Sequence, residues 1–363
     1  MCSKQSRMEF SRLHFSLMKH NTYLSALIIN ISLCLSAQVL SSTATDPAID
    51  DQPLREALSL PDWFKLSFLD IQEDLDEANR GRRGLIIYFG QSYCPYCKAH
   101  LKNNWERKDI VAYTRANFDV IAINTRGNSP VADIDGKQYS EKIFSSRYKA
   151  TFTPTVLFFD DTGKQALKLT GYRRPYQFRA ALEYVADKHH RQETFRSYLA
   201  RAEGADSFGQ DTLNESVIFS SPPYNLFELK KASPLVVFFE ERKCHACDVL
   251  HAGPLDQVAI LKQLNHMNSV QLDMWSTTPV VTPEGKKTTA KKWADKLALN
   301  YSPTLIFYDE SGKEIIRVDS VVGFFRLQSV LQFINTRAYR TQPSFQLWRS
   351  EELRKRMNPS SNK

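Results

Sequence analysis

Four of the six cysteines form two pairs with the same spacing: Cys94 with Cys97, and Cys244 with Cys247. A separation of three residues puts both side chains on one face of a helical turn, so their sulfurs can form a disulfide without moving the backbone. When that disulfide is reduced, the first thiolate can attack the disulfide of a partner, and the second cysteine can then release the product. The spacing therefore predicts thiol-disulfide exchange, with Cys94 and Cys244 attacking and Cys97 and Cys247 resolving.

Each cysteine pair lies where an apolar strand is followed by a polar helix. Residues 85–89 and 235–239 are rich in β-branched and aromatic side chains and end a few positions before each pair. The first cysteine then begins a helix, where unsatisfied backbone N–H groups amount to about half a positive charge and favour a thiolate. Pro95 suits the first helical turn, because its missing N–H costs nothing there.

Three other uses of such cysteines are alternatives to thiol-disulfide exchange. A zinc site needs four ligands, but the two pairs lie 150 residues apart, far from the spacing of a zinc ribbon. Haem attachment needs a histidine after the second cysteine, where this sequence has Lys98 and Asp248. A purely structural disulfide is the remaining alternative, although so short a loop constrains the unfolded chain little. We therefore predict neither a metal nor a cofactor.

The chain repeats itself at an offset of 149 to 150 residues. The strand at 85–89 aligns with 235–239, and Thr153-Pro154-Thr155 aligns with Ser302-Pro303-Thr304. The last helix of each copy has apolar residues at i, i+3, i+4 and i+7, namely Phe178, Ala181, Leu182 and Val185, then Leu327, Val330, Leu331 and Ile334. Agreement over more than 100 residues indicates a duplication.

The order of elements in each copy predicts an α/β fold, with a central mixed β-sheet flanked by helices. In the first copy we expect strands at 85–89, 120–123, 155–159 and 166–169 and a helix near 140–148. The predicted domains are residues 55–200 and 224–350. A linker rich in Gly, Ser, Asp and Pro at 201–223 separates them, and a polar tail follows at 351–363.

One proline in each copy opens an apolar strand about 60 residues after the cysteines. A cis peptide is cheap only before proline, so we predict cis bonds at Pro154 and Pro303. They would expose the backbone of Thr153 and Ser302 beside the cysteines, where an extended substrate peptide could pair as an added strand. A trans proline opening an edge strand is the alternative, and recurrence in both copies argues against it.

These residues resemble a known fold. Cys-x-x-Cys after a strand, followed by Thr-Pro or Ser-Pro before another strand, resembles thioredoxin. The closer resemblance is to exported SoxW-like thioredoxins, and it rests on Trp63-Phe64, Asp135-Gly136-Lys137, Thr153-Pro154-Thr155 and Gly171-Tyr172. It covers most of residues 60–350 and implies two thioredoxin-like domains that act on protein thiols and disulfides, with an unidentified redox partner.

The sequence departs from this family before each cysteine pair. Thioredoxin reductants carry tryptophan before the first cysteine and a buried carboxylate six residues before that cysteine. Here those places hold Tyr93 and Tyr88 in the first copy, and Lys243 and Phe238 in the second. We therefore expect the buried carboxylate to be absent.

The two loops between the cysteines differ. Pro95 and Tyr96 make the first loop resemble the glutaredoxin active site, and we expect them to tune the pKa of the Cys94 thiolate. His245 makes the second loop resemble exported DsbA-type oxidases. A charged His245 together with Lys243 would stabilise the Cys244 thiolate and make that disulfide more oxidising. The alternative, to which the sequence gives equal weight, is that His245 is an exposed loop histidine with a small effect on the Cys244 thiolate. We expect His100 and His251, one turn beyond the cysteines, to be solvated.

The N-terminus has the layout of a secretory signal peptide. A basic stretch precedes apolar residues 23–40, and small polar residues follow up to Ala44, after which we predict cleavage. Cleavage would remove Cys2 and Cys34. The mature protein would be exported, most simply to the periplasm, where disulfides form. The alternative is that this segment stays uncleaved as a membrane anchor. We expect no contact with a membrane other than through this segment.

Charge excludes one class of partner. The 363-residue chain has a net charge of +8 but no dense basic stripe, so we predict no nucleic-acid partner. The function expected is thiol-disulfide oxidoreductase. An oxidase or isomerase rather than a reductase is one alternative, and a peptide-binding or chaperone-like module whose cysteines only lock its folds is another.

Overall fold

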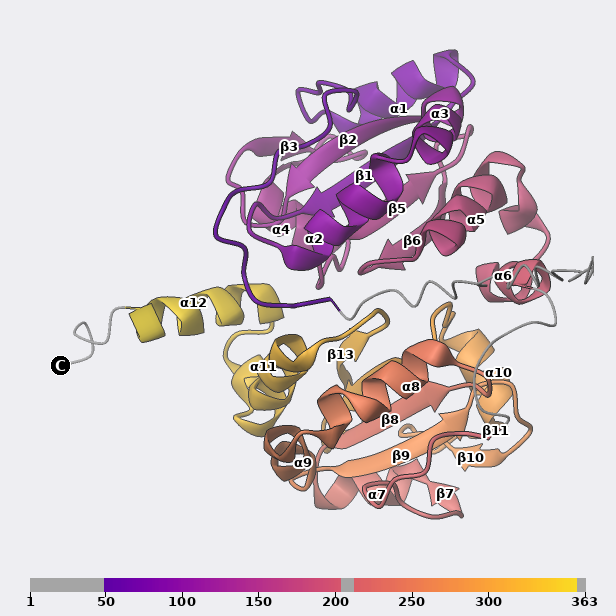
Figure 1. The fold of residues 1–363 in the computed structure, drawn as a ribbon, viewed down its shortest axis with the longest axis vertical. Helices are drawn as coiled ribbons and strands as arrows, with labels where there is room; N and C mark the ends of the chain where they lie inside the picture. Colours follow the sequence, from indigo (N-terminus) through magenta and orange to yellow (C-terminus); the bar gives the residue numbers. More distant parts are fainter. Residues whose placement is uncertain (1–48, 204–211, 358–363) are drawn as a thin grey trace, which may run out of the picture. The chain divides into compact units, whose positions relative to one another are not determined.

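Two copies of one α/β unit follow each other along the chain (Figure 1). The computed structural model describes residues 49–203 and 212–357, so the predicted signal peptide at 1–44 lies outside the described residues. All described residues belong to one compact unit. Among them, no helix is long and apolar enough to cross a membrane.

The first copy is built on a four-stranded mixed sheet in the order β2-β1-β5-β6. Its strands are β1 Gly84–Gly90, β2 Phe118–Asn124, β5 Thr155–Phe159 and β6 Gln165–Thr170. Strand β1 runs parallel to β2 and antiparallel to β5, which pairs antiparallel with β6. All of β1 and β5 is buried, as expected of continuous apolar runs covered on both faces. The predicted strands and the mixed sheet are confirmed.

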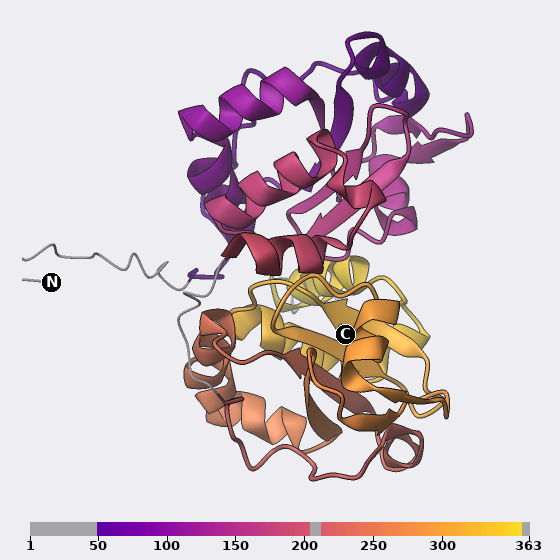
Figure 2. The same ribbon diagram turned by 90° about the vertical axis from the view of Figure 1, so that its right-hand side faces the viewer.

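Helices cover both faces of this sheet (Figure 2). They are α1 Ile71–Arg80, α2 Pro95–His100, α3 Lys108–Asn117, α4 Glu141–Arg147, α5 Pro175–Ala186 and α6 Phe195–Glu203, with a π-helical turn Leu101–Trp105 and a 3-10 turn His189–Arg191. Alternate residues of β1 serve the two faces: Ile86 joins a core with Phe178 of α5, and Ile87 joins one with Phe144 of α4.

The second copy repeats the arrangement, with the sheet order β13-β12-β8-β9. Its strands are β8 Leu235–Glu240, β9 Asn268–Asp273, β12 Thr304–Tyr308 and β13 Glu314–Val318. Its helices are α7 Leu226–Ala232, α8 His245–Ala252, α9 Val258–Leu264, α10 Ala290–Lys296, α11 Phe324–Asn335 and α12 Phe345–Met357, with 3-10 turns Pro254–Asp256 and Ala338–Arg340. The predicted duplication therefore holds for sheet order as well as sequence.

Each copy also contains a short hairpin that the sequence did not predict. Strands β3 Pro130–Ala132 and β4 Gln138–Ser140 pair antiparallel, as do β10 Pro279–Val281 and β11 Lys287–Thr289. The short strand β7 Tyr224–Asn225 pairs with β10. Three-residue strands are too short for a recognisable alternating pattern, so the sequence carries no strand signal there.

Two helices end near the predicted domain limits. Helix α6 ends at Glu203, close to the start of the predicted linker at 201–223. Helix α12 extends to Met357, beyond residue 350. The domain limits themselves stay predictions.

Candidate active site

Cys94 lies where the loop after β1 enters helix α2, and it is the N-cap residue of that helix. Its Sγ accepts a hydrogen bond from the backbone N–H of Cys97 at 3.0 Å. The two cysteines form a disulfide, with Cα atoms 5.1 Å apart. Pro95 occupies the first turn, as predicted. The N-terminal N–H groups of α2 therefore point at the sulfur that would carry the thiolate charge.

The second copy reproduces this geometry at helix α8. Cys244 is its N-cap, and the Cys244 Sγ accepts a hydrogen bond from the backbone N–H of Cys247 at 3.1 Å. The two residues form a disulfide with Cα atoms 5.2 Å apart. The Ser302 hydroxyl oxygen lies 3.5 Å from the Cys244 Sγ and 3.4 Å from the Cys247 Sγ.

Both predicted cis prolines are present, at Thr153-Pro154 and Ser302-Pro303. The Thr153 hydroxyl lies 3.3 Å from the Cys94 Sγ, and the Thr153 carbonyl oxygen lies 3.5 Å from the same sulfur. Each copy therefore brings its cysteine pair and its proline loop together, although about 60 residues separate them in the chain.

The residues expected to tune the thiolates differ in their surroundings. Tyr96 is buried, donates its hydroxyl to Asp51 Oδ2 at 3.1 Å and accepts from the backbone N–H of Gly323 at 2.8 Å. Burial raises the pKa of Tyr96. His245 is the first residue of α8 and is half-buried, and Lys243 is exposed. The tuning roles of His245 and Lys243 stay predictions.

The Cys94–Cys97 disulfide is covered partly by residues that lie far from it in the sequence. Both cysteines pack in an apolar cluster with Tyr96 and Tyr172, and Ile49, Leu58 and Val321 lie against this cluster. The segment before α1 is held there by backbone hydrogen bonds, from Leu54 N–H to the Tyr93 carbonyl at 3.2 Å and from Leu58 N–H to the Ser92 carbonyl at 2.7 Å. Cys94 is 5% exposed as a result.

The second copy has a buried carboxylate that the sequence did not predict, at another position than the one that Phe238 occupies. Glu240, two positions after Phe238 at the end of β8, is fully buried. Its Oε1 lies 2.9 Å from His251 Nε2, and its Oε2 accepts from Gln271 Nε2 at 3.0 Å. His251 follows Cys247 by one turn of α8, so the pair lies on the face of the helix that carries the second cysteine.

His100 is also buried, so the expectation that both histidines are solvated is wrong. Its ring stacks on Tyr88 at 6.0 Å and meets Trp105 edge-on at 4.7 Å. Asn104 Nδ2 lies 3.0 Å from His100 Nδ1. Burial, and secondarily the charge of Arg173, lowers the pKa of His100 to about 3, so the ring is neutral.

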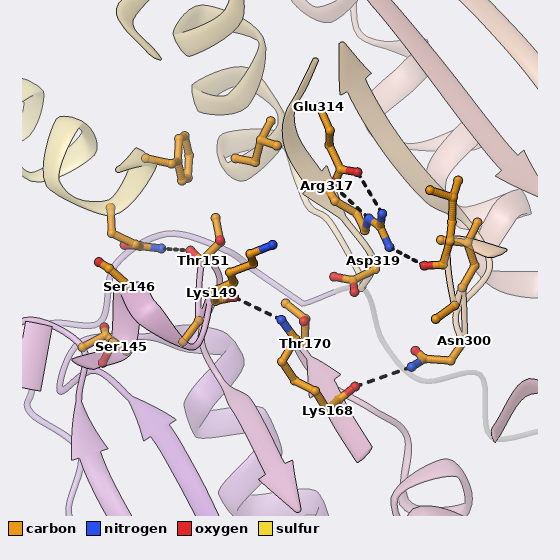
Figure 3. A pocket seen from close by; sticks show the side chains of 18 of the residues that line it. Ser145, Ser146, Lys149, Thr151, Lys168, Thr170, Asn300, Glu314, Arg317 and Asp319 are labelled. Atoms are coloured by element: carbon orange, nitrogen blue, oxygen red, sulfur yellow. Dashed lines mark hydrogen bonds and ion pairs between the residues drawn. The ribbon is translucent and has the colours of Figure 1, made fainter. Parts of the chain in front are cut away.

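A cavity lined by other residues than the paired cysteines is shown in Figure 3. It has a volume of about 950 Å³, and residues of both copies line it, including Lys149, Lys168, Asn300 and Arg317. Asn300 Nδ2 donates to the Lys168 carbonyl at 3.5 Å, and Arg317 forms an ion pair with Glu314 at 2.9 Å. None of the four paired cysteines lines it, so it is not the place of the sulfur chemistry.

Within residues 49–203 and 212–357, no cluster of three or more His, Cys, Asp or Glu side chains could hold a metal ion. The chemistry that the described side chains can perform at these two sites is that of paired thiols next to a helix N-terminus.

Several solved structures are similar to parts of this chain. Among solved structures, similarity extends to a thioredoxin-fold protein from Helicobacter pylori, with 21% identity over 37% of this chain and 96% of that chain and a TM-score of 0.30. It also extends to a thioredoxin from Thermus thermophilus, with 24% identity over 32% and 83% and a TM-score of 0.26. A disulphide isomerase from Xylella fastidiosa matches with 18% identity over 40% and 98% and a TM-score of 0.23. No curated protein matches the sequence.

The model of the thioredoxin-like domain family matches twice, at residues 71–186 and 228–335. The two matches together cover more than half of the chain and contain both cysteine pairs. The chain therefore belongs to the thioredoxin-like domain family, as two tandem domains, and is a thiol-disulfide oxidoreductase.

Proposed function

We propose that this protein is exported and exchanges disulfides with protein substrates through both cysteine pairs. The observation that carries the proposal is the same in each domain: an N-cap cysteine, its partner one turn later and a cis-proline loop against the sulfurs. A disulfide that only locked the fold would not require the attacking sulfur to face the helix N-terminus.

The exchange begins with the Cys94 or Cys244 thiolate of the reduced domain. The thiolate attacks one sulfur of a substrate disulfide, the substrate S–S bond breaks, and the departing sulfur leaves as a thiolate that takes a proton from water. Cys97 or Cys247 then attacks the mixed disulfide and releases the second substrate thiol. The domain ends as a disulfide, and the substrate gains two electrons and two protons. The reverse sequence oxidises a substrate dithiol, so the direction follows from the redox partner.

Each helix N-terminus stabilises the attacking thiolate. The N–H of Cys97 donates to the Cys94 Sγ, and the N–H of Cys247 donates to the Cys244 Sγ. A hydrogen bond to the charged form lowers a thiol pKa, so both first cysteines are expected to be the nucleophiles. The Thr153 and Ser302 loops would hold an extended substrate segment beside them.

Export is proposed from the N-terminal sequence and the cysteine usage. A basic stretch, apolar residues 23–40 and small residues up to Ala44 have the layout of a signal peptide. All cysteines after this segment belong to the two disulfides, which persist in oxidising compartments such as the periplasm.

Trapping of mixed disulfides tests this proposal. We expect Cys97→Ser and Cys247→Ser variants, expressed as the full chain in cells, to accumulate covalent adducts that dithiothreitol releases. The matched controls Cys94→Ser/Cys97→Ser and Cys244→Ser/Cys247→Ser lack the attacking sulfur and should accumulate none. If neither single variant forms adducts above its control, the exchange proposal is wrong, and partners retained without a covalent bond would support the peptide-binding alternative.

A further inference from the structure

Arg326, in the first turn of α11, reaches the active-site loop of the other domain. Its Nη2 donates to the Thr153 carbonyl oxygen at 3.1 Å, and its guanidinium carbon lies 3.5 Å from the centroid of the Tyr96 ring. The same Thr153 oxygen lies 3.5 Å from the Cys94 Sγ. A cation from the second domain is therefore within two hydrogen-bond lengths of the attacking sulfur of the first.

This guanidinium is buried without full compensation. Arg326 is 4% exposed, and its Nε and Nη1 are buried without a hydrogen-bond partner among the described residues. The hydrogen bond to Thr153 is to a neutral carbonyl and does not cancel the charge. Burial lowers the pKa of Arg326 to about 10, so the group stays charged at neutral pH. A buried cation is costly unless an anion forms nearby, and reduction of the disulfide supplies one at Cys94.

Three other titratable groups face Arg326: Asp51, Tyr96 and Arg349. The Asp51 carboxylate caps the start of α11, where it accepts from the backbone N–H groups of Arg326 at 2.8 Å and Phe325 at 3.3 Å. Those helix N–H groups compensate its charge. Tyr96 is neutral because burial raises its pKa, and Arg349 adds a second cation. The balance of these groups is positive.

We propose that Arg326 is a positioning residue of the Cys94 site, and that its charge stabilises the Cys94 thiolate and makes the Cys94–Cys97 disulfide more oxidising. The inference rests on the proposed function in taking Cys94 as the attacking residue. A group that stabilises the thiolate stabilises the reduced form, so the disulfide becomes easier to reduce.

The first domain has an uncharged residue at the position that aligns with Arg326. Where Arg326 stands in α11, the aligned position in α5 holds Gln177, whose side chain accepts from the N–H of Arg174 at the start of its own helix. Cys244 is therefore an internal control for Cys94 in one molecule.

The test measures alkylation of each cysteine as a function of pH. The reduced full chain is reacted briefly with iodoacetamide between pH 4 and 10, and peptide mass spectrometry reports Cys94 and Cys244 separately. We expect Arg326→Gln to raise the alkylation midpoint of Cys94 by about one pH unit, a tenfold loss of thiolate at low pH, and to leave that of Cys244 unchanged. Arg326→Lys keeps the charge and should restore most of the difference.

Two controls keep the result interpretable. Arg337→Gln removes an arginine just beyond the other end of α11, where it binds Glu310, and should move neither midpoint. Arg326→Met removes the charge but keeps an unbranched apolar side chain, and it serves if Arg326→Gln does not fold, with circular dichroism reporting folding. An unchanged Cys94 midpoint in a folded variant overturns the proposal, and so does an equal shift at both cysteines.

A glutathione titration gives a second readout of the same charge. In Arg326→Gln, the equilibrium constant for reduction of the Cys94–Cys97 disulfide by glutathione should fall about tenfold. The constant for the Cys244–Cys247 disulfide should not change. The opposite sign, or no change, contradicts the proposal. Neither readout requires turnover, so failure here is distinct from failure to trap mixed disulfides.

Discussion

The guanidinium of Arg326 lies 3.5 Å from the centroid of the Tyr96 ring, and Tyr96 is one of the two residues between the cysteines of the first pair. Tyr96 also accepts from the N–H of Gly323, immediately before α11. The second domain thus forms part of the wall of the first active site. This relationship makes the two sites chemically unequal although their cysteine geometry is the same.

Gly171 and Ser320 lie so close together that we expect a single methyl group added at Gly171 to lower the stability of the protein. Gly171 has φ +75°, and a Cβ there would lie 2.1 Å from the Ser320 Cβ. Gly136 has the same φ of +75° with nothing within 4 Å, so Gly136→Ala measures the backbone strain alone, about 1–2 kcal/mol. We expect Gly171→Ala to cost about 1–3 kcal/mol more than Gly136→Ala in urea unfolding. Equal losses of stability in the two variants would show that Ser320 moves aside without a further loss of stability.

The buried Glu240–His251 pair predicts a large loss of stability on truncation. Glu240→Ala would leave His251 Nε2 and Gln271 Nε2 facing no carboxylate, at a cost of about 3 kcal/mol. Glu228 pairs with Lys231 on the surface, so Glu228→Ala should cost less than about 1 kcal/mol. Urea unfolding of the two variants checks the difference, and comparable small losses would contradict a structural role for the buried pair.

His100 predicts an acid-dependent loss of stability. Its folded pKa is lowered to about 3, below the value of about 6.5 in an unfolded chain, so only the unfolded chain binds this proton between those pH values. Stability is therefore lost as pH falls through this window, by about 3 kcal/mol at pH 4.5. Wild type should lose that much more than His100→Gln between pH 7 and 4.5, measured by urea unfolding and tryptophan fluorescence. Equal losses would mean that His100 does not titrate on unfolding.

Local patterns in the sequence predicted much of the fold and the centre of each site. The strand at 155–159, the cis peptide before it and the N-cap cysteines follow from apolar runs, a proline and a fixed spacing, and all recur in both copies. Such features depend on neighbours in the chain, so residue type and order are sufficient to predict them.

The remaining features depend on contacts between residues far apart in the chain. Asp51 caps a helix that begins more than 270 positions later, and Arg326 meets Thr153 across 173 positions. The buried Glu240 carboxylate meets His251 and Gln271, which lie 11 and 31 positions later. A single sequence carries no periodic signal for such pairings, which is why the composite first site was not predicted.

The most direct test of disulfide exchange is turnover of a disulfide-bonded model peptide by the full chain, with dithiothreitol as the electron donor. Wild type should reduce the peptide well above the rate of dithiothreitol alone, Cys94→Ser and Cys244→Ser should each retain the turnover of the other site, and Cys94→Ser/Cys244→Ser should fall to the uncatalysed rate. Wild-type turnover in the double variant would contradict the assignment of Cys94 and Cys244 as the attacking residues.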